Sequence, residues 1–254
     1  MLTDAQWTVL GPLVEQCRPY AKVPPSTLRR TLSAILWRHE NGAKWRSLPA
    51  EMGPWWMAAQ TFIRWSRLGV WERLLALVQA RGVELGMTFL DGTSVRAHQD
   101  VAPRRSASEA LGRSRGGFGT KACVIADGAG RAIAFIAPGQ AHELPQAAPL
   151  LERLPGVPRW VVADRGYTSH RFREHIWSLG ARPAIPPQRH EAPIACPSWI
   201  YSNRNRVERL WARLKEWRAV ATRYEKTARS FMGVHCLAAA LDWIRRYRGL
   251  VDRV

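Results

Sequence analysis

Residues 160–164 read Trp-Val-Val-Ala-Asp, a short run of large apolar and β-branched residues that ends in a carboxylate. Such a run is typical of a buried β-strand, because aromatic and β-branched side chains pack well on a pleated sheet. Residues 87–91, Met-Thr-Phe-Leu-Asp, show a similar pattern. We therefore expect two buried strands, with Asp91 and Asp164 each at the carboxyl end of its strand.

The residues around these two runs indicate that strands and helices alternate after residue 86. Short β-like runs over 121–126 and 132–137 flank Asp127-Gly128, a dipeptide that signals a hairpin. The other expected elements are helices over 142–154, 169–179, 199–220 and 228–246, a strand over 182–186, and a mobile Gly/Ser/Arg-rich loop over about 103–119. This order indicates an α/β or α+β core.

Residues 1–85 differ from the rest, because they predict short helices joined by tight Gly and Pro turns. A Thr3 cap precedes apolar residues at helical spacing, and this spacing recurs over 28–37. The basic residues that these helices and turns carry include Lys44, Arg46, Arg64 and Arg67. Such a unit suits helix-turn-helix-like DNA binding, with a plain helical bundle as the alternative. We expect two domains, 1–85 and 86–254.

The charge of the chain indicates a polyanionic partner. Lys and Arg total 38 against 20 Asp and Glu, so the formal net charge is +18. Basic side chains that bind phosphates release counterions, which gives nucleic-acid affinity independent of sequence. A membrane surface or an Arg-rich genome are the alternatives, and the second does not explain the small number of acids.

Other features argue against several classes of protein. The apolar runs are too short to span a bilayer, and the N-terminus lacks the basic and apolar segments of a secretory signal. Four cysteines are scattered without a CxxC pair, which argues against a zinc site and a disulfide framework. We therefore expect a cytoplasmic protein that has no membrane partner.

The predicted helix over 199–220 carries a narrow polar stripe. At about 100° per residue the stripe is roughly 60° wide, and it contains Tyr201, Arg204, Glu208 and Lys215. The expected core-facing residues are Val207, Leu210, Trp211, Leu214 and Trp217, and the expected solvent-facing residues are Arg206, Arg209 and Arg213. Glu208 therefore borders the buried side. It either joins a surface ion-pair network with Arg204 at i,i+4, or completes a metal site with the two aspartates.

The two aspartates are candidate metal ligands because ends of neighbouring strands lie side by side in an α/β sheet, where such sheets place their sites. Carboxylates there can share Mg²⁺ or Mn²⁺, since these hard cations prefer oxygen ligands. Taken alone, either aspartate is also consistent with a cap for the turn that follows it.

The spacing Tyr201-x₂-Arg204-x₃-Glu208-x₆-Lys215 resembles the YREK signature of bacterial insertion-sequence DDE transposases, in the superfamily of insertion sequences four and five. Residues 90–93, 139–143 and 163–167 are similar to members of this superfamily, and residues 41–49, 64–67 and 204–224 resemble its insertion-sequence-five branch. The resemblance covers nearly the whole chain.

This resemblance implies an RNase H-like core, a mixed sheet flanked by helices, preceded by a small all-helical domain. It implies that Asp91, Asp164 and Glu208 hold two Mg²⁺ ions, for which Mn²⁺ can substitute. Two ions clamp the attacking and leaving oxygens of an in-line displacement at phosphorus. Water would first cut the ends of the element, and the freed 3′-hydroxyl would then attack target DNA.

The resemblance also implies the partners. These are double-stranded DNA, in the form of terminal inverted repeats and target DNA, and a second copy of the chain in a homodimer. Arg204 and Lys215 would hold phosphates and Tyr201 the DNA end, with Lys121, Arg64 and Arg67 as further DNA-binding candidates. A nuclease of the RNase H fold without strand transfer and an inactive DNA-binding remnant are the alternatives.

Glu143 is a competitor for the third acid, because it lies in the matching segment Gly139-Gln-Ala-His-Glu143. It falls in the first turn of a predicted helix, where a negative charge interacts favourably with the helix dipole. We therefore expect a structural role for Glu143.

Overall fold

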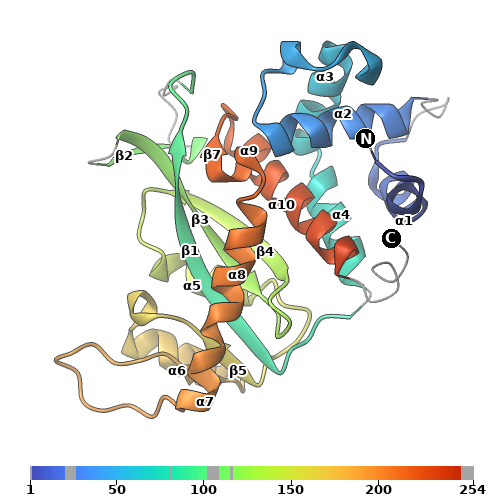
Figure 1. Ribbon diagram of the computed structural model, residues 1–254. Helices are drawn as coiled ribbons and strands as arrows, with labels where there is room; N and C mark the ends of the chain where they lie inside the picture. Colours follow the sequence, from blue (N-terminus) through green and yellow to red (C-terminus); the bar gives the residue numbers. More distant parts are fainter. Residues whose placement is uncertain (1, 21–26, 81, 102–108, 115–116, 247–254) are drawn as a thin grey trace. The chain divides into compact units, whose positions relative to one another are not determined.

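A computed structural model describes residues 2–20, 27–80, 82–101, 109–114 and 117–246 (Figure 1). The chain divides into two compact units. The helical unit comprises Met1–Ala80, Arg96–Glu109 and Leu214–Val254, and the sheet unit comprises Arg81–Val95 and Ala110–Arg213. This division differs from the expected boundary at residue 85, because the segment after residue 213 groups with the N-terminal helices.

The sheet unit contains a mixed sheet. Its strands are β1 (Met87–Ala97), β2 (Gly112–Ser114), β3 (Gly117–Ala126), β4 (Ala132–Gly139), β5 (Trp160–Val162) and β6 (Arg182–Ala184). The order is β2-β3-β1-β5-β6, with β4 paired to β3. Strands β1, β5 and β6 are parallel, whereas β4 and β2 are antiparallel to β3. The fold is RNase H-like, as predicted.

The predicted hairpin around Asp127-Gly128 is confirmed. Strands β3 and β4 pair through Ile125↔Ala134 and Ala126↔Ala132. The fully buried Asp127 carboxylate organises the turn, since it accepts backbone N–H bonds from Ala129 at 3.1 Å and Arg131 at 2.9 Å. It also forms an ion pair with the Arg131 guanidinium at 2.6 Å, which compensates its burial.

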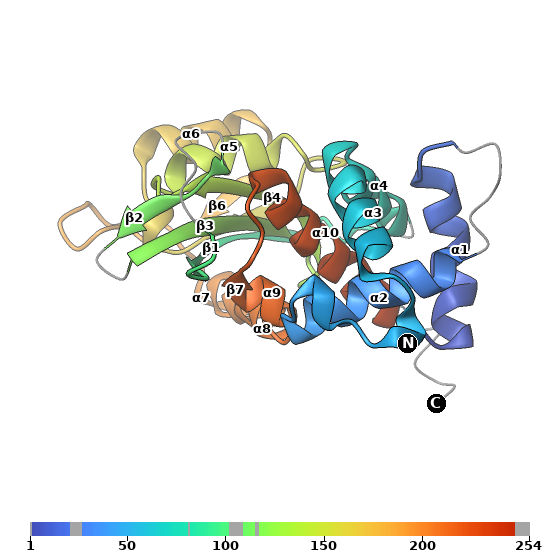
Figure 2. The same ribbon diagram turned by 90° about the horizontal axis from the view of Figure 1, so that it is seen from above.

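Helices cover both faces of this sheet. Figure 2 shows α5 (Leu144–Leu151) and α6 (His170–Ser178) on one side and α8 (Asn205–Leu214) on the other. The core under α5 and α6 includes Leu90, Ile125, Leu150, Val161 and Ile176, all of them fully buried. Apolar strands packed between helices explain why residues 87–90 and 160–163 are hydrophobic without alternation.

Strand β1 is longer than expected, so Asp91 lies within it and not at its end. The final residues of β1 pair with β7 (Thr222–Arg223), in the register Arg96↔Thr222. Both partners of that pair belong to the helical unit. The expected loop over 103–119 is also corrected, because its described residues include β2 and the start of β3; residues 103–108 and 115–116 lie outside the described residues.

The helix expected over 199–220 is broken into three helices. They are α7 (Ser198–Tyr201), α8 and α9 (Arg218–Ala221), with a 3₁₀ turn over Ser202–Arg204. The Asn203 amide and the Ser202 hydroxyl both donate to the carbonyl of Trp199, at 2.8 and 3.3 Å, and so compete with the helical backbone pattern. The expected apolar face is confirmed, since its members are all buried: Val207, Leu210, Trp211, Leu214 and Trp217.

The basic side of this region is only partly solvated, contrary to expectation. Arg206 donates to the carbonyl of Gly128, and Arg213 donates to that of Gly130 at 2.8 Å, whereas Arg209 is exposed. Both carbonyls belong to the turn between β3 and β4, which α8 thus anchors.

The helical unit is built from α1 (Asp4–Cys17), α2 (Leu28–Asn41), α3 (Trp55–Arg67), α4 (Val70–Gln79), α9, β7 and α10 (Ala228–Arg245). The Thr3 cap is confirmed, with a capping box completed by Gln6. Helix α10 packs on α3 and α4. Gly233 permits this approach, because a Cβ there would lie 2.7 Å from the ring of Trp71. None of the described helices is long and apolar enough to cross a membrane.

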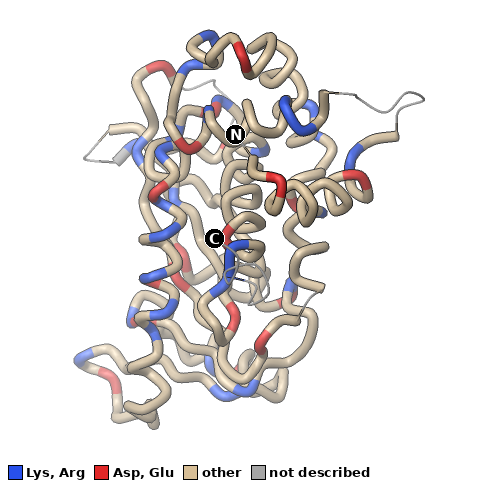
Figure 3. Tube along the Cα trace, turned by 45° about the vertical axis from the view of Figure 1, so that its right-hand side comes forward, with Lys and Arg blue, Asp and Glu red and all other residues tan. Residues whose placement is uncertain are grey.

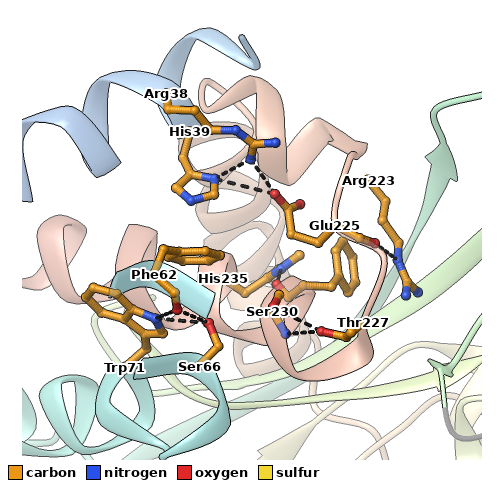
Figure 4. Close-up of polar contacts among 11 residues, drawn as sticks. Arg38, His39, Phe62, Ser66, Trp71, Arg223, Glu225, Thr227, Ser230 and His235 are labelled. Carbon is orange, nitrogen blue, oxygen red and sulfur yellow. Dashed lines mark hydrogen bonds and ion pairs between the residues drawn. The ribbon is translucent and has the colours of Figure 1, made fainter. Parts of the chain in front are cut away.

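A buried polar cluster connects α2 to the segment before α10 (Figure 4). Arg38 and Glu225 form an ion pair in which the side chains are 7% and 4% exposed. The fully buried His39 accepts a bond from Arg38 at 2.9 Å through Nδ1. Burial and the neighbouring Arg38 charge hold the pKa of His39 well below its usual range, so the ring is neutral.

Candidate active site

Asp91 and Asp164 stand two residues beyond the last paired positions of adjacent parallel strands. The register between β1 and β5 runs from Met87↔Trp160 to Phe89↔Val162. Asp164 Oδ1 accepts the backbone N–H of Gly166 at 2.8 Å, which fixes the turn after β5. The parallel register therefore brings the two carboxylates to the same level of the sheet.

Arg204 links the first strand acid to the acid of α8. Its guanidinium lies 3.6 Å from Asp91 Oδ1 and donates to Glu208 Oε1 at 2.8 Å. The Asp91 side chain is 15% exposed, whereas that of Glu208 is 55% exposed. The i,i+4 pair expected from the sequence is thus present, and it extends to the sheet.

Glu143 also reaches this site, which the sequence did not predict. Glu143 is the N-cap residue of α5, but its side chain makes no capping hydrogen bond. It forms an ion pair with Lys121 at 3.3 Å, and a Cβ at Gly92 would clash with its carboxylate. Glu143 therefore packs directly beside the residue that follows Asp91. The sequence signals that point to Glu143 are its place in the segment 139–143 and the absence of a side chain at position 92.

Burial raises the pKa of Asp91 to about 6. Arg204 opposes this shift, while the carboxylates of Asp164 and Glu143 add to it. Neighbouring carboxylates disfavour the charged form of Asp91, since like charges repel. A divalent cation would offset that repulsion.

We expect the metal-free protein to lose stability as pH rises toward neutrality. The folded pKa of Asp91 lies above its unfolded value, so its stabilising contribution is complete below about pH 4 and is lost as pH passes about 6. The loss is on the order of 3 kcal/mol. Denaturant unfolding in EDTA should show that Asp91→Asn gains stability relative to wild type between pH 4 and pH 7. If the difference in unfolding free energy between Asp91→Asn and wild type did not change with pH, the expectation would be contradicted.

Tyr167 and Cys123 lie beneath the acids and are fully buried. Within the described part of the chain, the Tyr167 hydroxyl has no hydrogen-bond partner. Burial raises the pKa of Tyr167, and the charges of Glu143, Asp91 and Asp164 contribute to the same shift. Burial also raises the pKa of Cys123 to about 12, which leaves the thiol protonated and unreactive.

The remaining residues predicted to bind DNA are distributed over both units. Tyr201 in α7 and Lys121 in β3 belong to the sheet unit. Lys215, Arg64 and Arg67 belong to the helical unit, where the last two are exposed on α3. Among the described residues, Lys121 is paired with Glu143, whereas Arg64 and Arg67 are exposed.

Within the described ranges, no three Asp, Glu, His or Cys side chains converge closely enough to form a metal-binding group. Asp91 and Asp164 come together, whereas the Glu208 carboxylate bonds Arg204. The donor set still fits a hard divalent cation, because it offers only carboxylate oxygens and two of its members repel each other.

We expect Gly92→Ala to reduce DNA cleavage by about 10- to 100-fold, since a misplacement near 1 Å at a reacting centre costs this much. The added methyl group would displace the Glu143 carboxylate or shift β1 beside Asp91. Gly86→Ala is the matched control, because nothing lies within 4 Å of a Cβ there. Removing the Glu143 side chain in the Gly92→Ala background should restore space. If the single variant Gly92→Ala cleaved DNA at the wild-type rate, the packing of Glu143 against Gly92 would not matter for cleavage.

Comparisons with known proteins identify the family. Residues 2–75 match the model described as putative transposase of the IS4/5 family, and residues 161–245 match the model described as transposase DDE domain. A putative transposase for insertion sequence element IS6501 from Brucella ovis is 37% identical over 112 residues, which span 42% of this chain and 84% of that protein. A putative transposase for IS402 from Burkholderia cepacia is 28% identical over 144 residues, 50% of this chain and 65% of that protein.

A solved structure supports the fold. The chain aligns with a piggyBac transposase, from a synaptic complex with hairpin DNA, at a TM-score of 0.52 and 9% identity. The alignment covers 96% of this chain and 71% of that chain. At this identity the likeness bears on the fold alone, whereas the DDE domain implies an enzyme that cleaves DNA with a divalent metal. The chain belongs to the IS4/5 family of insertion-sequence transposases, and it is a DNA transposase.

Proposed function

We propose that Asp91, Asp164 and Glu208 carry the chemistry of DNA cutting and joining, with two Mg²⁺ ions for which Mn²⁺ can substitute. The observation that supports this most is the position of Arg204, whose guanidinium interacts with both Asp91 and Glu208. Acids from β1 and α8 thus already share one positive charge. When bound, the two ions would stabilise the attacking and leaving oxygens of an in-line displacement at phosphorus.

Glu208 would change its partner when the site is loaded, because Arg204 and a cation compete for the same carboxylate oxygens. Arg204 would then be free to hold a DNA phosphate, for which its planar, permanently charged guanidinium is suited. Lys215 would bind the backbone as well, and Tyr201 would pack against the DNA end. These roles rest on the match to the YREK signature.

The reaction would proceed in two displacements at the same site. In the first, water attacks the phosphorus at each end of the element and a 3′-hydroxyl leaves. In the second, this 3′-hydroxyl attacks a phosphorus of target DNA, and a target 3′-hydroxyl leaves. Only the nucleophile differs, so one set of acids serves both steps.

DNA binding would be shared between the units. Lys and Arg are spread over both of them (Figure 3). Arg64 and Arg67, exposed on α3, would contact double-stranded DNA at the terminal inverted repeats. Lys121 would contact a DNA phosphate if its ion pair with Glu143 were replaced by that contact. Since two ends are joined together, we propose a homodimer on DNA, acting in the cytoplasm.

A strand-transfer assay tests this function. The substrate is a duplex that ends in the inverted repeats flanking the reading frame, incubated with a supercoiled target and Mg²⁺. We expect cleaved ends and, after them, joined products. Cleavage without joined products would favour the nuclease alternative. Neither product, with retained DNA binding, would favour the inactive remnant.

A further inference from the structure

A cavity of about 340 Å³ opens in the helical unit and is lined only by residues of that unit. Three aromatic rings form much of its wall: Trp45, Phe62 and Tyr224. Its volume lies near the lower end of the range for small-molecule sites, about 300 to 1,000 Å³. None of these residues belongs to the proposed active site.

The charges around this cavity favour an anionic ligand. Among the described residues that line it, Arg38, Arg67 and Lys226 are basic and Glu225 alone is acidic. That acid is already paired with Arg38, which leaves an excess of positive charge. Arg67 and Lys226 are exposed, whereas Arg38 and Glu225 are buried. Cations therefore lie at the solvent side, and the paired charges lie deeper.

The inner wall combines stacking surfaces with polar groups. The Arg38 guanidinium lies 4.9 Å from the centroid of Trp45 and 5.8 Å from that of Tyr224. Figure 4 shows Arg38 and Glu225 pointing toward one another above Phe62. Among the described residues, Arg38 Nε and Glu225 Oε2 have no hydrogen-bond partner. Both atoms belong to the buried Arg38–Glu225 pair, whose residues line the cavity.

We propose that this cavity takes one unpaired nucleotide of a DNA strand, with its base against the half-buried rings of Trp45 and Tyr224 and its phosphate at Arg67 and Lys226. Aromatic walls hold any base through its π-face, and a basic rim follows the backbone. In a fully paired duplex the base is stacked and cannot enter. The cavity would thus select frayed or single-stranded DNA. This assignment rests on the transposase function but not on the proposed acids.

The test compares two single strands of equal length and equal phosphate charge, an oligothymidylate and its abasic counterpart. Fluorescence anisotropy with the full chain in EDTA measures binding without cleavage. We expect the base-containing strand to bind about 10-fold or more tightly than the abasic one. Trp45→Ala should remove this preference. Ile63→Trp, which fills the cavity from an exposed position, should remove it without deleting packing.

Trp56→Ala is the matched control, because Trp56 is 49% exposed and does not line the cavity. It should leave the preference intact. As a second readout, 2-aminopurine in the strand should be quenched by wild type and not by Ile63→Trp.

Equal affinity for the two strands, or equal effects of Trp45→Ala and Trp56→Ala, would overturn the proposal. If free thymidine monophosphate displaced the labelled strand as strongly as an unlabelled strand does, the assignment of the cavity to DNA would be overturned. Because binding is measured in EDTA, failure of strand transfer would leave this result unaffected.

Discussion

Asp91→Asn, Asp164→Asn and Glu208→Gln should each lower Mg²⁺-dependent DNA cleavage by at least about 1000-fold, as expected when several kcal/mol of transition-state stabilisation are lost. Each change removes an anionic oxygen while keeping the size of the side chain. DNA affinity should remain, because these residues do not supply the phosphate-binding charge. Cleavage is measured on an end-labelled duplex, and affinity by anisotropy in EDTA.

Glu152→Gln is the matched control, since Glu152 is an exposed acid at the end of α5. It should cleave at the wild-type rate. Glu143→Gln provides the sharper comparison, because Glu143 packs beside Asp91's neighbour Gly92. If Glu143→Gln abolished cleavage and Glu208→Gln did not, the third acid would be Glu143 and the assignment of Glu208 would fail.

Glu225→Leu should destabilise the helical unit by about 3–5 kcal/mol, the usual cost of leaving one member of a buried pair uncompensated. Arg38 would keep its charge in a site where its side chain is 7% exposed. The double change Arg38→Met with Glu225→Leu should recover most of the loss, since apolar replacements of buried pairs are often neutral. Denaturant unfolding followed by circular dichroism measures these differences.

The ion pair between Glu40 and Arg245 is the control for this prediction. Its side chains are 39% and 50% exposed, so Glu40→Ala should cost less than about 1 kcal/mol. If Glu225→Leu cost no more than Glu40→Ala, the Arg38–Glu225 pair would not stabilise the fold. If the double change were as unstable as the single one, the loss would come from packing and not from an unpaired charge.

The half-buried acid Glu143 illustrates what local reasoning leaves out. A carboxylate near a helix N-terminus interacts favourably with the helix dipole, so the sequence indicated a structural role. In the structure the side chain turns instead to Lys121 and Gly92. These partners come from β3 and β1, and no periodicity within α5 could reveal them.

The sequence by itself determined the features that depend on neighbouring residues. Apolar runs predicted β5 and β6, the Thr3 cap predicted the start of α1, and helical spacing predicted α10 and the buried face of α8. The four-residue signature indicated the family that the comparisons establish. Each of these signals lies within about 20 residues of chain, because the periodicity of apolar side chains and helix capping depend only on nearby residues.

Only the tertiary structure decided how distant segments combine. The pairing of Arg96 with Thr222 extends β1 past Asp91, and the packing of α10 on α4 groups the C-terminal segment with the N-terminal helices. Arg204 likewise joins the acid of α8 to the acid of β1. Such contacts join residues that are far apart in the sequence and share no local pattern. They are stabilised by burial and charge, which exist only in the folded state. The acids, Glu143 among them, could therefore be named from the sequence, but the shared arginine and the packing of Glu143 against Gly92 emerged only from the fold.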